Sequence, residues 1–573
     1  MDRKKSTFVP VFDPATDCLP PTDAEAEERF EIVFHDAAIE SAPPPLWLPQ
    51  RGALLHWLER AFLLAEKPIT RIVGAPQLNP FYYTGEIAFF LFALISITGL
   101  FLVLFFQVGF DASYLFISRI EHQPLARVVR AAHRYASDAF VIVSVIHALR
   151  LLAQNRLRGA RWLAWVSGIA MIFPVWLAGV TGYWLIWDER ALAITISFDQ
   201  ILQRGAMSIA NLIATDQKGN GWIYIMIVLL AHLALTALIG VAIWVHLARL
   251  NRPRWLPDRY WLIGLTVVVI GVSIFAPVGM LPKADLSSAP GEFSIDLFYL
   301  FYLPLAFDAM FNAPGVWIGL IGLVLALAAL PWLSFRQEAP PRLAIEKSKC
   351  TGCTLCAVDC PYKAITMEPR TDGAPHKFIA LEHPDLCVAC GICIGSCDGN
   401  AIALGTISTP TIWNAATARL KRAPGAEIVL TCKRHAAYGA HDFLRDGANV
   451  QVIALPCVGA IYPDLVGRIR QAGARDVRVI GCPPADCANR EGNAWAEGRI
   501  TRQRLPRLRK NFGDAPITLR WLAPDEFARG LTNRADDVSL TRKLTWRNFV
   551  PAFALLILVL LAQIWITTPM FKP

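Results

Sequence analysis

Charged residues are scarce in this chain of 573 residues. Only 18% of the residues are Asp, Glu, Lys or Arg, whereas 54% are hydrophobic. This composition excludes a disordered chain and is typical of a membrane protein that carries soluble parts. The net charge is +9, but the basic residues form no stripe with interleaved stacking aromatics, so nucleic acid is not an expected partner.

Cysteine is missing from the apolar half of the chain. One of the 13 cysteines is Cys18, expected to be a free thiol, and the other 12 lie between Cys350 and Cys487. A heme held covalently by cysteine is therefore excluded from the apolar spans. Clustered thiols favour a reducing compartment, so the cysteine-rich part is expected to face the cytoplasm.

Glycine-rich phosphate loops and dinucleotide fingerprints are also missing, and no catalytic nucleophile motif is visible. Substrate oxidation is therefore assigned to a separate subunit, a flavoprotein or dehydrogenase on the cytoplasmic side. The basic N-terminal stretch runs into Pro and Asp without an apolar core of signal-peptide length. No cleaved signal peptide is expected.

Long uncharged runs predict membrane spans. Residues Ile87–Phe110 form a run of 24, enough to cross a hydrocarbon core of ~30 Å. Further such runs are Trp162–Trp187, Tyr260–Leu281, Ala313–Phe335 and Phe549–Phe571. Two more apolar segments contain charged or imidazole groups, which are expected to face the interior of a bundle: about Ala131–Leu152 and Gly221–Leu250. The sequence thus predicts seven spans.

Arginines in alternate loops predict the orientation of these spans. The loops after the second and fourth spans contain Arg150, Arg156, Arg158 and Arg161, and Arg249, Arg252, Arg254 and Arg259, whereas the other loops are rather acidic. The positive-inside rule places the arginine loops in the cytoplasm, together with the cysteine-rich part. We expect a bacterial cytoplasmic membrane protein in contact with lipid, with an amphipathic helix near Leu54–Leu64 in its N-terminal arm.

Four histidines recur at matched spacing in two of the spans. His133 and His147 are 14 residues apart in the second span, and His232 and His246 are 14 residues apart in the fourth. Fourteen residues make nearly four helical turns, so each pair lies on one face with ~21 Å of rise between its members. The two spans cross in the same direction, so they offer two imidazole pairs at two depths. This pattern predicts two stacked bis-histidine hemes.

Two cysteine runs have the spacing that wraps thiolates around two cubane clusters. The pattern C-x2-C-x2-C-x3-C occurs at 350–360 and again at 387–397. Each run gives three ligands to its own cluster and the fourth cysteine to the other. The first 4Fe–4S site is assigned Cys350, Cys353, Cys356 and Cys397, and the second Cys387, Cys390, Cys393 and Cys360. This block resembles the bacterial two-cluster ferredoxin.

A further cysteine set follows the ends of predicted strands. The apolar runs Glu427–Thr431, Val450–Leu455 and Val477–Gly481 alternate with helical stretches and predict a small parallel sheet. Cys432, Cys457, Cys482 and Cys487 come after these runs, at the sheet edge where α/β folds place ligands. Four thiolates suit a 2Fe–2S cluster or a zinc ion.

The apolar half, about Phe81–Phe335, resembles cytochrome b of the quinol-oxidising cytochrome bc complexes. The resemblance rests on the two histidine spacings, on Arg134 and the His147-x2-Arg150 pair, on Gly182-Tyr183-Trp184 and on Ala284–Leu305. It implies two b-type hemes, one held by His133 and His232 near the outer face and one by His147 and His246 near the cytoplasm. Arg130, Arg134 and Arg150 are candidate partners of heme propionates, or anchors at lipid headgroups. Relatives of this kind are dimers, so a homodimer within a larger complex is expected.

One family motif is replaced. Where the family has Pro-Glu-Trp-Tyr at the outer quinol site, this chain reads Ser294-Ile-Asp-Leu-Phe-Tyr299. Asp296 is either a proton acceptor for quinol, because burial can lift a carboxyl pKa toward neutrality, or a helix cap. No Rieske-type motif exists in this chain, so a bifurcating cycle would need a partner.

Residues 425–525 look like the small iron–sulfur (delta) subunit of methyl-viologen-reducing hydrogenases. The resemblance rests on the stretch Gly481–Asn493, which contains the Cys482-x4-Cys487 element. It implies a 2Fe–2S cluster that relays electrons to a flavoprotein. A further family cysteine, three residues after Cys432, is His435 here. Four-cysteine ligation is favoured, with His435 as a substitute ligand, structural zinc and unliganded cysteines as alternatives.

The expected fold is multi-domain. It comprises a cytoplasmic arm (1–80), a cytochrome b-like α-helical membrane bundle (81–335), an α+β ferredoxin domain (336–405), a small α/β iron–sulfur domain (406–535) and a C-terminal transmembrane helix (536–573). The expected function is electron transfer between a cytoplasmic partner and the quinone pool. Electrons run either toward quinone or, driven by the membrane potential, from quinol to the clusters. The alternative is a non-catalytic membrane anchor that tethers a soluble reductase.

Overall fold

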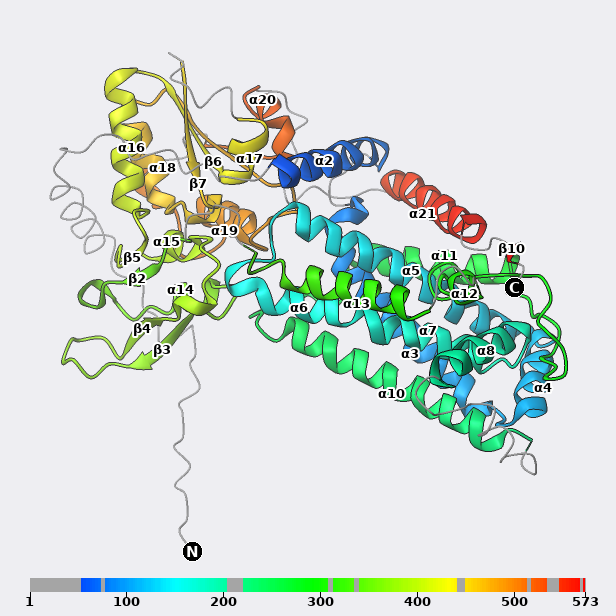
Figure 1. Cartoon of the computed structure of the whole chain (residues 1–573). Coiled ribbons are helices and arrows are strands. Elements are labelled where there is room, and N and C mark those ends of the chain that lie inside the picture. The colour runs from blue at the N-terminus through cyan, green and yellow to red at the C-terminus, as the bar shows by residue number, and fades with distance from the viewer. Residues whose placement is uncertain are drawn as a thin grey trace, which may run out of the picture. The chain divides into compact units, whose positions relative to one another are not determined.

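The computed structural model describes residues 53–73, 78–203, 220–307, 313–333, 340–440, 449–512, 517–532, 546–566 and 570–571 (Figure 1). Most of the predicted N-terminal arm, including Cys18, lies outside the described residues. The described residues form two compact units. The first contains Leu250–Arg252 and the described residues from 340 to 532, and the second contains the others.

Apolar helices make up most of the second unit. Four segments are long and apolar enough to cross a membrane: Pro80–Phe105, Pro124–Ala153, Gly159–Trp184 and Trp222–Leu247. They contain helices α3 (Thr84–Phe105), α5 (Pro124–Ala153), α6 (Trp162–Ala170) with α7 (Ile172–Trp184), and α10 (Trp222–Leu247). The other three predicted spans coincide with shorter apolar helices: α11 (Arg259–Phe275), α13 (Ala313–Ala329) and α21 (Trp546–Ile566). Among the described residues, helices of this number, length and composition are typical of a multi-pass membrane protein.

Local sequence explains where several of these helices begin and break. Pro124 is the first residue of α5, where its missing N–H costs nothing. The Asp258 side chain accepts a hydrogen bond from the Tyr260 N–H and caps α11. The third predicted span is broken at Met171 into α6 and α7. Pro174 lies just beyond this break and has no N–H to bond a carbonyl of the preceding turn, which accounts for the interruption.

Shorter elements complete the second unit. They are α2 (Ala53–Val73), α4 (Phe110–Glu121), α8 (Glu189–Gln203), α12 (Leu303–Phe307) and the antiparallel strands β1 (Phe293–Ser294) and β10 (Met570–Phe571). Helix α2 contains the predicted amphipathic segment. It buries Leu63 and Glu66 and leaves Leu54, Trp57 and Leu64 exposed.

The first part of the other unit contains two short antiparallel sheets of two strands each and two one-turn helices. Strand β2 (Leu343–Ile345) pairs antiparallel with β5 (Ile402–Leu404), and β3 (Ile365–Pro369) with β4 (Phe378–Glu382). Helices α14 (Leu355–Asp359) and α15 (Ile392–Ser396) each lie within one of the two cysteine runs. The two runs therefore occupy similar loop-and-helix settings.

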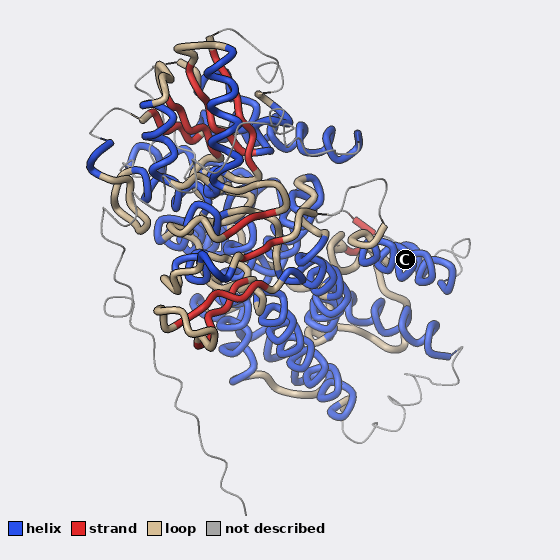
Figure 2. The backbone as a smooth tube through the Cα atoms, turned by 90° about the vertical axis from the view of Figure 1, so that its left-hand side faces the viewer, coloured by secondary structure: helices blue, strands red, loops and turns tan. Residues whose placement is uncertain are grey.

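The rest of this unit is a parallel sheet covered by helices. The strand order is β7 (Val450–Leu455), β6 (Glu427–Cys432), β8 (Val477–Gly481) and β9 (Thr518–Trp521), all in parallel pairs. The helices are α16 (Thr409–Arg422), α17 (Lys433–Tyr438), α18 (Pro463–Gln471), α19 (Gly492–Ile500) and α20 (Phe527–Gly530). Figure 2 shows these strands beside the short strands of the ferredoxin-like part. The predicted parallel sheet is confirmed, with β9 as an additional strand.

The short sheets and the parallel sheet share one hydrophobic core. It contains Ile345, Ile392 and Leu404 from the first part and Leu430 and Val479 from the second. Seven of its members are cysteines: Cys356, Cys390, Cys393, Cys432, Cys457, Cys482 and Cys487. The residues predicted to bind cofactors are thus part of the core. The domain boundaries drawn from the sequence stay predictions.

Candidate functional site

The four histidines of the second unit form two facing pairs. The ring centroids of His133 (α5) and His232 (α10) are 6.5 Å apart, and those of His147 and His246 are also 6.5 Å apart. An atom bonded to both facing nitrogens at about 2.0–2.1 Å each fits between rings at this distance. The structure therefore brings together the histidines that were paired from the sequence.

A hydroxyl group fixes the orientation of each ring. The Nδ1 atoms of His133, His147, His232 and His246 lie 3.0–3.1 Å from the hydroxyls of Thr98, Thr84, Thr181 and Ser167, respectively. Nδ1 of His133 and of His232 also lies 3.0 and 2.9 Å from backbone carbonyls, which only accept hydrogen bonds. Nδ1 therefore carries the proton in these two rings, and Nε2 is left free to bind iron.

A glycine lies against each of the four rings. A Cβ atom on Gly99, Gly85, Gly182 or Gly168 would lie 3.0, 3.1, 3.3 or 3.5 Å from the Cε1 atom of His133, His147, His232 or His246. Each glycine directly follows the hydroxyl residue of the same ring, so the motif is Ser/Thr-Gly. Sequence reasoning missed these residues. The signal was available, because the motifs recur 14 residues apart in the first span (84 and 98) and in the third (167 and 181).

These residues fit b-type hemes. Two imidazoles with free Nε2 atoms supply axial ligands, and the spacing of each pair accommodates one iron atom. The close glycines leave room for flat groups between the helices. The hemes would be held by His133 with His232 and by His147 with His246.

The three arginines predicted near heme propionates have carboxylate partners in the structure. Arg130 pairs with Glu121 and donates to the Val278 carbonyl at 2.8 Å. The Arg150 Nε atom donates to Glu66 Oε1 at 2.8 Å, and both side chains are buried. A second role at the hemes stays a prediction for these residues.

Arg134 is the third of these arginines and lies in a buried polar cluster. It pairs with Asp138, four residues along α5, and its Nη2 atom is 2.7 Å from Asp296 Oδ2. The Tyr183 hydroxyl donates to the same Asp296 oxygen at 3.0 Å. One arginine thus faces two carboxylates. Asp138 was not singled out from the sequence, although a carboxylate inside a span is itself a signal of function.

Asp296 has the contacts of a turn cap. Its Oδ1 atom accepts from the Phe298 N–H at 2.7 Å, and its backbone carbonyl accepts from the Leu300 N–H at 2.7 Å. Its side chain is 1% exposed and is held by Arg134 and Tyr183. The proposed proton-acceptor role would therefore require this cluster to open or to pass the proton on.

The eight cysteines of the two ferredoxin-like runs line two separate cavities. Cys350, Cys353, Cys356 and Cys397 line one, and Cys360, Cys387, Cys390 and Cys393 line the other. The fourth cysteine of each run lies in the cavity of the other run, as the predicted ligand exchange requires. Within the first unit, the Asn251 side chain donates to the Cys360 carbonyl at 3.1 Å, so Leu250–Arg252 contacts the second site.

Backbone amides point at four of these sulfur atoms. The N–H groups of Ala380, Ala401, Ala364 and Ala389 lie 3.2–3.5 Å from the sulfurs of Cys350, Cys397, Cys360 and Cys387. Such bonds stabilise negative charge on cluster sulfurs. Without a cluster, burial raises the pKa of Cys356 and Cys393 and raises that of Cys397 to about 12. These buried thiols would therefore ionise when they bind a metal and stay protonated without one.

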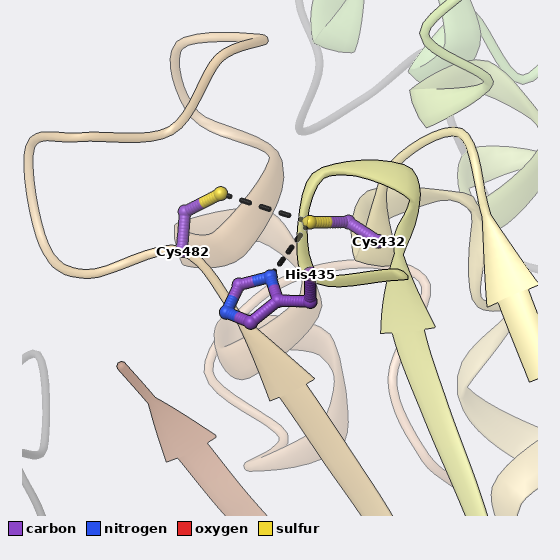
Figure 3. A group of neighbouring side chains, drawn as sticks. All are labelled: Cys432, His435 and Cys482. Atoms are coloured by element: carbon purple, nitrogen blue, oxygen red, sulfur yellow. Dashed lines mark hydrogen bonds between the residues drawn. The ribbon is translucent and has the colours of Figure 1, made fainter. Parts of the chain in front are cut away.

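The second cysteine set lies at the carboxyl edge of the parallel sheet. Cys432 ends β6, Cys457 follows β7, and Cys482 follows β8. Cys487 lies in the loop before α19. All four are buried. The sulfurs of Cys432 and Cys482 are 3.7 Å apart (Figure 3).

The four thiols form two pairs with matching electrostatics. The Cys482 thiol and nearby backbone N–H groups lower the pKa of Cys432, and the Cys457 thiol with backbone N–H groups lowers that of Cys487 to about 7. The pKa of each partner, Cys482 and Cys457, is raised because it holds the shared proton and is buried. Each pair therefore loses one proton readily, as metal binding requires.

This pairing fits two metal ions better than one. Two sulfurs bound to one metal at about 2.3 Å in tetrahedral geometry lie about 3.8 Å apart, close to the Cys432–Cys482 distance. Among the described residues, Cys432, Cys482 and His435 offer ligand atoms within 4.8 Å of one another, and Cys457 and Cys487 do not belong to that group. A single zinc ion would need all four sulfurs in one such group.

His435 lies beside the first of these pairs (Figure 3). Its Nδ1 atom is 3.0 Å from the Cys432 sulfur, and its Nε2 atom is 3.0 Å from the Leu522 carbonyl. That carbonyl only accepts, so Nε2 is the protonated nitrogen. Burial lowers the pKa of His435, which favours the neutral ring with a free Nδ1 facing the sulfur. The site thus offers five ligand atoms, the four cysteine sulfurs and His435 Nδ1, to a metal centre that needs four protein ligands.

Three segments of the chain match known families. Residues 69–203 match cytochrome b/b6/petB, residues 349–401 match the 4Fe–4S dicluster domain, and residues 428–536 match the methyl-viologen-reducing hydrogenase delta subunit. These are the three resemblances noted in the sequence, which are thereby confirmed. The chain thus joins segments that are similar to these three kinds of protein.

Three individual relatives are cytochrome b proteins. The cytochrome b subunit of the Chlorobaculum thiosulfatiphilum cytochrome bc complex is 25% identical over 223 residues, 35% of this chain and 52% of the relative. Cytochrome b6 of Euglena gracilis is 28% identical over 115 residues, which are 20% of this chain and 54% of the relative. The cytochrome b subunit of Bacillus subtilis menaquinol:cytochrome c reductase is 25% identical over 115 residues, which are 20% of this chain and 51% of the relative. The chain spans about half the length of these curated relatives. A solved structure, a hyperthermophilic respiratory Complex III, has 20% identity and a TM-score of 0.34, and covers 44% of this chain and 76% of that one.

Proposed function

We propose that the chain is the membrane subunit that links a cytoplasmic redox partner to the quinone pool. One observation carries the proposal. Two histidine pairs at iron-binding spacing and twelve paired or grouped cysteines occur in one chain. When bound, two b-type hemes, two 4Fe–4S clusters and one 2Fe–2S cluster would supply one-electron steps between the partner and quinone.

The protein's own residues hold and tune these groups. The Ser/Thr-Gly motifs orient the histidines, and the backbone N–H groups near the cysteine sulfurs favour their ionised state. The cysteine pairing supports a 2Fe–2S cluster in the hydrogenase-delta-like segment. His435 would then lie beside Cys432 without being required as a ligand.

The quinone side is proposed to involve the polar cluster of Arg134, Asp138 and Asp296. Arg134, next to His133, and Asp138 lie on α5, and Asp296 accepts a hydrogen bond from Tyr183 of α7. The name of the Bacillus subtilis relative includes menaquinol, which supports a quinol as the membrane substrate. Asp296 would take up a quinol proton through this cluster.

The orientation proposed from the arginine loops puts the iron–sulfur segments in the cytoplasm of a bacterial cell, with the chain in the cytoplasmic membrane. The missing nucleotide fingerprints support a separate flavoprotein or dehydrogenase as the partner, in a larger complex with a dimer of this chain. Electrons would run to quinone, or from quinol to the clusters at a cost of ~2.3 kcal/mol per charge for each 100 mV.

An anaerobic potentiometric titration of the purified full-length protein tests this function. Hemes are followed optically and clusters by EPR. We expect two b-type hemes and three clusters, with hemes that a quinone analogue reoxidises. Protein without heme, or hemes inert toward quinone, would contradict the proposal and leave a tethering role. If quinol reduces the clusters, an uncoupler should abolish that reaction only when the membrane potential drives it.

A further inference from the structure

Ile392 lies between the second 4Fe–4S site and the Cys457–Cys487 pair. It is fully buried and lines the cavity of the second site. On its other side are two glycines. A Cβ atom on Gly459 would lie 2.9 Å from Ile392 Cγ1, and one on Gly492 would lie 3.5 Å from Ile392 Cδ1 and 2.3 Å from the Cys457 sulfur. One side chain therefore separates the two cysteine sets.

Glycines allow the backbones of the two parts to meet here. A Cβ atom on Gly395 of α15 would lie 2.4 Å from the Gly459 carbonyl oxygen, and one on Gly391 would lie 3.2 Å from Ala460 Cβ. Gly459 and Ala460 come two and three residues after Cys457. Helix α15 thus packs closely against the chain segment that holds Cys457.

A buried ion pair fixes this contact. The Arg499 guanidinium donates to the Gly459 carbonyl at 2.9 Å and to Ser396 Oγ at 2.6 Å, and its Nη2 atom is 2.6 Å from Asp359 Oδ2. The side chains of Arg499 and Asp359 are 0% exposed. They tie α19, α14 and α15 together, so the spacing between the two cysteine sets is fixed.

The first 4Fe–4S site has a different setting. Its lining residues run from Ile345 to Ile402 and do not include Ile392. Three of its four cysteines, Cys350, Cys353 and Cys397, are only half-buried, whereas three of the four in the second site are buried: Cys360, Cys390 and Cys393. The two 4Fe–4S sites are therefore not equivalent toward the Cys457–Cys487 pair.

We propose that Ile392, Gly459 and Gly492 place the second 4Fe–4S site, and not the first, next to the 2Fe–2S site, so that these two sites exchange electrons directly. The inference rests on the proposed function, because it requires both sites to be loaded. One electron passes from the reduced site to the oxidised one, and no bond or proton changes place. Ile392 is a positioning residue in this arrangement.

Magnetic coupling in the full-length protein tests the arrangement. A reduced neighbour shortens the spin relaxation of a reduced 2Fe–2S cluster. The matched variants C387A/C390A and C350A/C353A each remove the first two cysteines of one run, and iron analysis verifies the loss of one cluster. We expect severalfold slower 2Fe–2S relaxation in C387A/C390A and wild-type relaxation in C350A/C353A.

Coupling that is lost in C350A/C353A and kept in C387A/C390A would overturn the inference. The C350A/C353A variant decides alone if the other fails to fold, because coupling must persist in it. The variants Ile392→Val and Ile394→Val compare two buried residues of α15. A Cβ atom on Gly492 would have both Ile392 and the Cys457 sulfur as neighbours, but not Ile394. We expect only Ile392→Val to change the coupling. A 2Fe–2S signal absent from the wild type would instead contradict the proposed function.

Discussion

The helices that contain none of the proposed heme ligands fix the orientation of the four histidines. Thr98, for example, donates its hydroxyl hydrogen to the Leu94 carbonyl at 2.7 Å and can therefore accept only from His133. Gly99 next to it gives the ring its space. Residues outside the ligand set thus select the ring tautomer and position, as partners of metal-bound histidines usually do.

A larger residue at Gly99 should expel one heme. A Cβ atom there would lie 3.0 Å from His133 Cε1, so the branched side chain of Gly99→Val should displace the ring. We expect loss of about half of the heme, with the heme at His147 and His246 kept. Heme content and a redox titration measure this.

Gly271→Val is the matched control, because Gly271 lies on an apolar helix and a Cβ there meets nothing within 4 Å. Two hemes with unchanged spectra in Gly99→Val would contradict the assignment of this glycine.

Replacing His435 should change the proposed 2Fe–2S cluster without removing it. His435→Leu deletes the nitrogen 3.0 Å from the Cys432 sulfur but leaves four thiolates, which suffice for ligation. Iron content should stay at the wild-type level while the reduction potential shifts, because polar contacts to cluster sulfurs help to set it. EPR-monitored titration measures both, with Cys482→Ser as the comparison that loses the cluster. Loss of the cluster in His435→Leu would make this histidine a ligand.

At the scale of single residues, the sequence indicated the proposed ligands better than the residues that hydrogen-bond or pair with them. The 14-residue histidine spacing and the C-x2-C-x2-C runs follow directly from ligand geometry. The partners of Arg134 and Arg150 were not predictable, because Asp296 and Glu66 come from distant segments and pair with them only after folding. Ser/Thr-Gly dipeptides are common in apolar helices, so their role was visible only beside the histidines.

At the scale of elements, buried ion pairs join helices that are far apart in the chain. Glu66 on α2 pairs with Arg150 on α5, and Asp359 on α14 with Arg499 on α19. Such pairs do not guarantee stability, but removing one partner leaves an uncompensated charge. They therefore mark contacts whose loss should be costly.

Glu66→Ala should detach α2 from the bundle. Arg150 would remain buried without its carboxylate, at a cost of about 3–5 kcal/mol. Thermal unfolding in detergent, followed by heme absorbance, measures the loss. Asp111→Ala is the control, since its pair with Lys283 is exposed and should contribute at most about 1 kcal/mol. Equal effects of the two variants would contradict this account.

Arg499→Met should loosen the packing of α19 on the ferredoxin-like part. The change leaves the buried Asp359 carboxylate with Arg504 as its remaining ion-pair partner and Ser396 as a hydrogen-bond donor, and it removes the donor to Gly459. We therefore expect destabilisation of about 3–5 kcal/mol. Anaerobic denaturation followed by cluster absorbance measures it. Arg475→Met is the control, because the Arg475 side chain is 63% exposed. An unchanged midpoint in Arg499→Met would show that the contact is not fixed by this pair.

Element prediction succeeded where the apolar pattern was strong. The three strands near 427, 450 and 477 and all seven apolar helices coincide with the predicted segments. Strand β9 was missed because Thr-Leu-Arg-Trp lacks a continuous apolar run and is recognisable only through its pairing with β8. Arg499 begins a stretch rich in basic residues, yet its side chain is fully buried by its partners in α14 and α15.

At the scale of the whole molecule, the first unit should keep its cofactors without the membrane helices. A chain of residues 340–532 contains all the grouped cysteines and the shared core. Of the described residues of this unit, it lacks only Leu250–Arg252. We expect a water-soluble protein with the same iron content and EPR signals as the full chain and no heme. An insoluble product, or loss of the second 4Fe–4S cluster alone, would show that the contacts of Asn251 with this site are required.

Seven cysteines belong to the hydrophobic core shared by the ferredoxin-like part and the parallel sheet. Without their metal, these cysteines would leave gaps in the middle of that core. The supply of iron then determines whether the chain folds stably and escapes degradation. In an iron-starved cell, the chain should be cleared by proteases and should not accumulate as an inactive membrane protein, and its abundance would report the cell's capacity to build clusters.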